Sequence, residues 1–87
     1  MNQASIWSTL RQTFREVFDD EALEIQAQTT AADVPEWDSL MHIHLLLAVE
    51  QAFGVRFNTG EVAALKNVGE MVALIETKLL AQERARV

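Results

Sequence analysis

Residues 38–53 read DSLMHIHLLLAVEQAF, a lone serine followed at once by a strongly apolar stretch. The preceding residues, 19–37, are acidic and include the only proline, Pro35. Asp38 and Ser39 both offer a side-chain oxygen to the unpaired backbone N–H groups of a first helical turn. The junction therefore predicts a helix over residues 39–53 with Asp38 as its main cap, which leaves the hydroxyl of Ser39 for another use.

The predicted helix is apolar on two sides when its residues are placed about 100° apart. One arc is an ordinary core stripe and holds Leu45, Leu46, Val49 and Phe53. A second arc lies beside Ser39 and holds Leu40, Ile43 and Leu47. A small domain cannot easily bury both sides of a helix. We predict that the second arc is a partner-docking face, extended by His44 and Glu50; the alternative is that neighbouring helices cover it.

Three further segments have helical signals. Residues 5–18 repeat apolar side chains at i, i+3, i+4 and i+7. The pairs Asn58/Glu61 and Asn67/Glu70 have capping-box spacing and predict helices over residues 60–66 and 68–81. Residues 82–87 lack apolar rhythm and are expected to fray. The sequence thus predicts an all-α, four-helix bundle in a single domain over residues 1–87, with a short third helix.

The connection over residues 19–37 is long for so small a domain. It lacks sustained periodicity, and Leu23, Ile25 and Val34 are its candidate anchors to the core. Trp37, at its end, is expected to close over the core. Loops of this length in compact domains are usually functional.

The amino-acid composition excludes several kinds of site and partner. With 87 residues and no cysteine, the chain has no disulfide, no thiolate metal site and no thiol nucleophile of its own. Any thioester chemistry must use an imported thiol. Neither a signal-like N-terminus nor an apolar run of membrane-spanning length is present, which predicts a soluble protein of the cytoplasm. The lack of flanking linkers or a second domain favours a free-standing protein, and a module excised from a longer protein stays open as the alternative. The net charge of −6 argues against nucleic acid as a partner.

The charges are unevenly distributed around Ser39. No lysine or arginine occurs between Arg15 and Arg56. Such a field would steer basic partner surfaces toward the serine, and salt would weaken the encounter. The carboxylates in this segment are Glu16, Asp19, Asp20, Glu21, Glu24, Asp33, Glu36, Asp38 and Glu50.

Two other side-chain groups carry weaker signals. His42 and His44 are two residues apart, so on a helix they point about 200° from each other and cannot share one metal ion. His42 falls on the core side of the helix and is expected to be a partly buried ring. Glu36 and Asp38 have no reactive partner nearby, and no histidine–acid arrangement activates Ser39. We therefore predict no metal site and no catalytic residue.

The stretch Asp38-Ser39-Leu40, with Asp33–Trp37 before it and Met41–Phe57 after it, resembles the acyl carrier protein family over about residues 6–80. In that family the serine at the start of the second helix carries 4′-phosphopantetheine, whose thiol holds acyl groups as thioesters. The resemblance implies that Ser39 is the attachment point in a carrier that is not itself an enzyme. It also implies that Asp38 helps the modifying enzyme to hold the Mg²⁺ that accompanies coenzyme A.

The implied partners are a phosphopantetheinyl transferase and acyl-loading and acyl-processing enzymes with basic and apolar docking surfaces, meeting a monomeric carrier. Some residues depart from the family pattern. Glu36 and Trp37 stand where a glycine and a small residue are common, and His42 and His44 lie where fatty-acid carriers are rich in acids. These departures favour a specialised pathway, such as polyketide biosynthesis. Two alternatives stay open: an aminoacyl or peptidyl carrier, and a helical adaptor without a prosthetic group that inserts Leu40, Ile43 and Leu47 into a groove.

Overall fold

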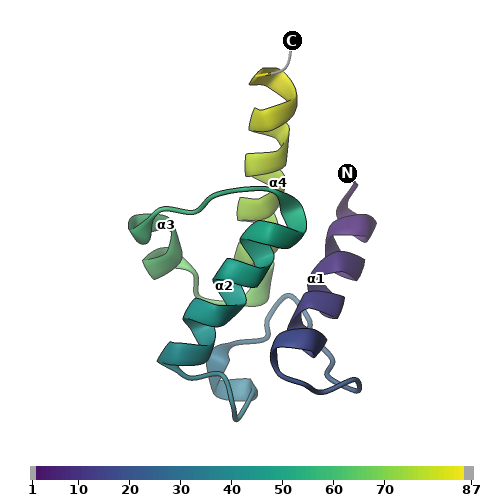
Figure 1. The fold of residues 1–87 in the computed structure, drawn as a ribbon, viewed down its shortest axis with the longest axis vertical. Coiled ribbons are helices and arrows are strands. Elements are labelled where there is room, and N and C mark those ends of the chain that lie inside the picture. The colour runs from purple at the N-terminus through teal and green to yellow at the C-terminus, as the bar shows by residue number, and fades with distance from the viewer. Residues whose placement is uncertain (1, 86–87) are drawn as a thin grey trace.

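Residues 2–85 are described by a computed structural model, and four stretches of them are α-helical. The helices are α1 (Gln3–Val17), α2 (Ser39–Phe53), α3 (Thr59–Ala64) and α4 (Val68–Ala85), and a short 3₁₀ helix, η1 (Ala31–Asp33), interrupts the first loop. Helix α1 runs toward the end of the molecule where the first loop lies, and α2 and α4 run back from it (Figure 1). The predicted all-α, four-helix fold is confirmed.

Side-chain caps explain where the helices begin. The Asn2 side chain accepts the Ser5 N–H at 2.8 Å, so α1 starts two residues earlier than the predicted residue 5. Asp38 caps α2 as predicted. Asn58 and Glu61 form the predicted capping box with bonds of 2.8 and 2.9 Å, and α3 starts at Thr59. The caps therefore set these boundaries to within two residues of their predicted positions.

Helix α4 has a different start from the predicted capping box. Asn67 accepts the Glu70 N–H at 2.8 Å, but Glu70 accepts from Lys66, not from Asn67. Two carbonyl groups of the first loop satisfy the next N–H groups, with Val68 donating to Thr29 at 2.9 Å and Gly69 to Ala27 at 2.8 Å. The first loop is thereby fastened to the start of α4.

The end of α4 differs from the prediction. Residues 82–85, which were expected to fray, continue the helix to Ala85. They are good helix formers without glycine or proline, and the Gln82 amide donates to the carbonyl of Gly54 at the end of α2. Residues 86–87 of the predicted frayed tail lie outside the described residues.

The core lies between α1, α2 and α4 and is closed by the first loop. The predicted core arc of α2 is buried in full. Ile25 and Val34 of the loop are buried and Leu23 is half-buried, as their anchoring role requires. Helix α3 contributes no buried residue. Within residues 2–85 no helix combines the length and apolarity needed to cross a membrane. The buried apolar residues are Ile6, Leu10, Phe14, Phe18, Ile25, Val34, Trp37, Leu45, Leu46, Val49, Phe53, Val55, Val68, Met71, Val72 and Ile75.

Candidate functional site

Ser39 is the first residue of α2. Helix α2 begins at the end of the molecule occupied by the first loop (Figure 1). Its side chain is exposed and makes no hydrogen bond with any part of residues 2–85. The preceding residue does the capping: Asp38 Oδ1 accepts the Met41 N–H at 2.9 Å, and the Asp38 carbonyl accepts the His42 N–H at 2.9 Å. The Ser39 hydroxyl therefore has no capping role, and it lies at the positive end of the α2 helix dipole.

Trp37 closes the loop that leads to Ser39. Its side chain is only 8% exposed, and the indole meets the Phe14 ring edge-on, with ring centroids 5.3 Å apart. The expectation that this ring covers the core is confirmed. The indole Nε1–H also donates to Nδ1 of His42 at 3.0 Å. Nothing in the apolar pattern indicated this bond, which crosses the start of α2.

His42 is half-buried against Trp37, as expected for a ring on the core side of α2. Burial lowers the pKa of His42, because the charged imidazolium is poorly solvated there. Indole N–H is only a donor, so the bonded Nδ1 must be the unprotonated nitrogen of a neutral ring. The geometry and the direction of the pKa shift thus both favour neutral His42.

The predicted docking face of α2 is exposed. Leu40, Ile43 and Leu47 are 64%, 57% and 54% exposed, and His44 is exposed as well. The alternative in which neighbouring helices cover these three residues is wrong for this fold. Isolated apolar side chains on a surface need no explanation, but three large ones on one helix beside an open hydroxyl form a patch.

Glu50 differs from the other residues predicted for the face. Its carboxylate Oε2 accepts the backbone N–H of Phe57 at 2.7 Å, and the side chain is half-buried. The geometry makes Glu50 a support for the connection between α2 and α3. A partner that bound this carboxylate would have to compete with the Phe57 N–H for it.

A shallow depression of about 390 Å³ borders the same face. Ile43 and Leu47 line it from α2, and Phe57 and Val62 line it from the connection and α3. Both α2 residues belong to the docking face, so the exposed apolar surface continues from α2 toward α3.

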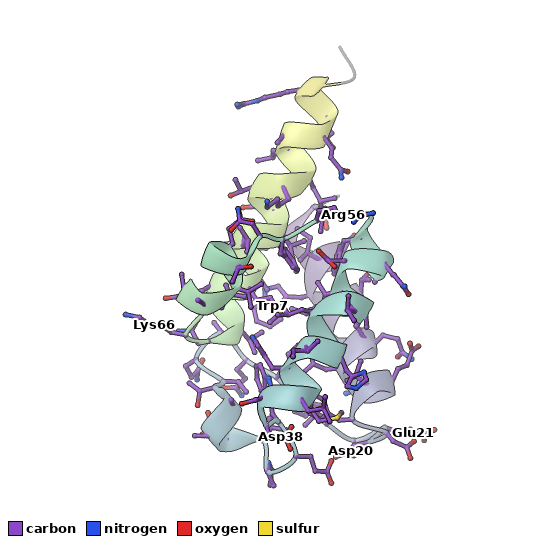
Figure 2. The ribbon with its side chains drawn as sticks, turned by 60° about the vertical axis from the view of Figure 1, so that its left-hand side comes forward. Trp7, Asp20, Glu21, Asp38, Arg56 and Lys66 are labelled. Carbon is purple, nitrogen blue, oxygen red and sulfur yellow. The ribbon has the colours of Figure 1, made fainter. Side chains whose placement is uncertain are left out.

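Acidic side chains gather at the serine end of the molecule. Asp20, Glu21 and Asp38 lie at the lower end in Figure 2, and Arg56 lies at the opposite end of α2. This arrangement agrees with the charge pattern of the sequence. Among residues 2–85 no group of three or more His, Asp or Glu side chains is placed to hold a metal ion.

Comparison with known proteins identifies the family. Residues 8–75 match the family described as "Phosphopantetheine attachment site". The chain belongs to this family of acyl carrier proteins. The acyl carrier protein of Acidothermus cellulolyticus is 31% identical over 75 residues, which are 86% of this chain and 89% of that protein. The one from Coprothermobacter proteolyticus is 29% identical over 79 residues, 91% of this chain and 96% of that protein.

A solved structure extends the likeness to the fold. The solution NMR structure of holo acyl carrier protein from Geobacter metallireducens has a TM-score of 0.85 and 36% sequence identity, and covers 90% of each chain. The protein is thus an acyl carrier and not an enzyme, with covalently attached 4′-phosphopantetheine as its cofactor. The alternative of an adaptor without a prosthetic group is wrong.

The serine end of α2 fits such a group chemically. An exposed hydroxyl is needed to form the phosphodiester, and Ser39 offers one without breaking an existing hydrogen bond. The phosphodiester carries a negative charge, which the N-terminus of a helix stabilises.

Proposed function

We propose that Ser39 is the attachment point of 4′-phosphopantetheine and that the protein presents acyl thioesters to a series of enzymes. The single observation that carries the proposal is the exposed, unbonded hydroxyl at the first residue of α2. The other two serines of the chain, Ser5 and Ser8, lie within α1. Neither is the first residue of its helix, as Ser39 is.

In the modification the Ser39 hydroxyl gives up its proton to the transferase as Oγ bonds to the pantetheine-bearing phosphorus of coenzyme A. The P–O bond between that phosphorus and the bridging pyrophosphate oxygen breaks, and adenosine 3′,5′-bisphosphate leaves with the bonding electron pair. Asp38 supports the step in two ways under this proposal. Its Oδ1 holds the first turn of α2 through the Met41 N–H, and the exposed carboxylate is available to Mg²⁺ bound with coenzyme A. Carboxylate oxygens are the ligands that Mg²⁺ favours in proteins.

We further propose that Leu40, Ile43, His44 and Leu47 form the surface that the transferase and acyl-processing enzymes contact. Glu50 stabilises the connection between α2 and α3, which borders this surface, by accepting the backbone N–H of Phe57. Helix α2 contains no acidic residue other than Glu50. Burial of apolar area at α2 should therefore supply most of the affinity, and the acidic loop around residues 19–38 should steer basic partners toward it.

The proposed setting is a specialised pathway of the polyketide kind, in which the protein acts as a monomer in the cytoplasm. What supports the pathway is the presence of Glu36 and Trp37 before the serine and the shortage of free acids on α2. Attachment to one carrier keeps an intermediate at high effective concentration near successive enzymes. Specificity then depends on which enzymes accept the apolar face.

The attachment proposal is tested by incubating the protein with coenzyme A, Mg²⁺ and a broad-specificity phosphopantetheinyl transferase and then measuring the intact mass. We expect the wild type and the control Ser8→Ala to gain the mass of one phosphopantetheinyl group, and Ser39→Ala to gain none. No gain by the wild type, or an equal gain by Ser39→Ala, would contradict the proposal.

A further inference from the structure

A hydrogen bond between two side chains bridges the predicted modification site. Trp37 lies two residues before Ser39 and His42 three residues after it, and the indole Nε1–H donates to the imidazole Nδ1 at 3.0 Å. The two rings lie 28° from parallel, with centroids 5.9 Å apart. The bond thus closes a ring of the chain that contains Asp38 and Ser39.

One side of this bridge is fixed to the core. The Trp37 indole packs edge-on against Phe14 and lies 6.2 Å from the Phe18 ring, centroid to centroid. Both phenylalanines are buried residues at the end of α1 and just after it. Because Trp37 is held by α1 and also bonded to His42, the first turn of α2 is tied to α1 through side chains.

The other contacts at this turn act along the backbone. Asp38 accepts N–H groups from Met41 and His42, which holds the turn helical but does not fix its direction relative to the rest of the bundle. The buried arc of α2, which begins at Leu45, fixes the body of the helix. The bond from Trp37 to His42 adds a side-chain tie to α1 at the exposed first turn, ahead of that arc, and so limits the movement of this turn.

We propose that Trp37 and His42 are positioning residues that fix the direction in which Ser39 is presented to the transferase. This inference rests on the proposed attachment at Ser39. Transfer to a hydroxyl requires the attacking oxygen to lie in line with the phosphorus and the leaving oxygen. Small displacements of a reacting atom from this geometry lower the rate strongly. The bridge reduces the orientations that Ser39 can adopt before the transferase binds.

The chemistry of the bond provides a selective test. The indole is a donor only, so residue 42 must supply an acceptor. Phenylalanine at position 42 keeps a flat ring but removes the acceptor, whereas glutamine keeps an acceptor oxygen without an imidazole. Phenylalanine at position 37 keeps an aromatic ring in the core and removes the donor.

The experiment measures kcat and KM of the transferase for the wild-type carrier and for Trp37→Phe, His42→Phe, the double variant and His42→Gln. All rates are taken where circular dichroism shows each variant fully folded. We expect each single change to phenylalanine to lower kcat/KM about fivefold, which is the size expected for one hydrogen bond. The double variant should lose no more than either single variant, and His42→Gln should recover to within about twofold of wild type.

Trp7 offers an internal control, because its indole makes no hydrogen bond within the described residues. Trp7→Phe should leave kcat/KM at the wild-type value. In NMR spectra the indole N–H of Trp37 should exchange with solvent more slowly than that of Trp7, and His42→Phe should speed the exchange of the Trp37 N–H while leaving that of Trp7 unchanged.

Three results would overturn the positioning role. They are wild-type rates for the two phenylalanine variants, fully additive losses in the double variant, and an unrecovered rate in His42→Gln although its Trp37 N–H stays protected. A wild type that gains no mass at all would instead contradict the proposed attachment at Ser39, so the two failures are distinguishable.

Discussion

The carboxylate of Glu50 accepts the backbone N–H of Phe57 at 2.7 Å, which turns the only acidic side chain of α2 toward the following connection. The carbonyl of Glu50 also accepts N–H groups, from Gly54 and Val55. Glu50 therefore ends one helix and holds the approach to the next. The docking face on α2 keeps its apolar residues, but its one carboxylate is already bonded within the protein.

We predict that Glu50→Ala lowers the free energy of unfolding by about 1–2 kcal/mol, because the half-buried Phe57 N–H loses its acceptor. Glu50→Gln keeps an acceptor oxygen and should lose less than half of that amount. Urea denaturation followed by circular dichroism measures both. If Glu50→Ala is as stable as wild type yet a poor substrate for partner enzymes, Glu50 is a docking residue instead.

The two apolar arcs of α2 should respond differently to substitution. Leu47→Asp changes a side chain that is 54% exposed. It should leave the melting temperature nearly unchanged while slowing modification or acyl loading about tenfold, as at other central interface residues. The control is Leu45→Ala, at a fully buried position, which should cost about 2–5 kcal/mol of stability. A large loss of stability in Leu47→Asp would contradict its assignment to the docking face.

The three glycines predict three different outcomes when each is replaced by alanine. At Gly69 a Cβ atom would lie 3.0 Å from the carbonyl oxygen of Ala27 and would push the first loop away from α4, at a cost of about 1–3 kcal/mol. At Gly54 the φ angle of 67° disfavours alanine by about 1 kcal/mol, although nothing lies near. At Gly60, inside α3, the atom nearest to an added Cβ would be Asn58 Oδ1 at 3.5 Å, so alanine should stabilise by up to about 1 kcal/mol.

Thermal melts of the three alanine variants test the predicted order of stability, in which Gly69→Ala is the least stable and Gly60→Ala the most stable. A Gly69→Ala variant as stable as wild type would mean that the first loop is not held closely against α4. A destabilised Gly60→Ala variant would mean that α3 contributes more packing than its lack of buried residues suggests.

Local chemistry made the fold predictable from the sequence. Asp38, Asn58 and Glu61 supply caps within three residues of the groups they satisfy, and the two arcs of α2 follow from helical periodicity alone. Contacts between distant segments were not predictable in this way. The carbonyl groups of Ala27 and Thr29 meet the start of α4 only because the whole first loop folds under it.

The candidate site likewise has features that the sequence predicts and features that it does not. Ser39 and the exposed arc of α2 could be predicted because one depends on a local motif and the other on spacing. The bonds from Trp37 to His42 and from Phe57 to Glu50 depend on rotamers and on loop paths, which periodicity does not describe. The extension of α4 to Ala85 follows no apolar rhythm and depends on helix propensity and on the bond from Gln82 to Gly54, which apolar periodicity does not describe.

Acid should destabilise the protein through His42. Burial holds the folded-state pKa of His42 below its ordinary value of about 6.5. Between the lowered pKa and about 6.5 the unfolded chain binds more protons than the folded protein, so the free energy of unfolding rises with pH in this window. Conversely, stability is lost as the pH falls from about 6.5 through the folded-state pKa, and protonation also removes the acceptor for Trp37.

The measurement is urea denaturation at a series of pH values from neutral to about 5, with His42→Gln as the matched control. The wild type should lose more stability than His42→Gln over this range, because glutamine does not titrate and still offers an acceptor oxygen to the indole. Equal slopes for the wild type and His42→Gln would show that the Trp37–His42 bond makes no pH-dependent contribution to folding.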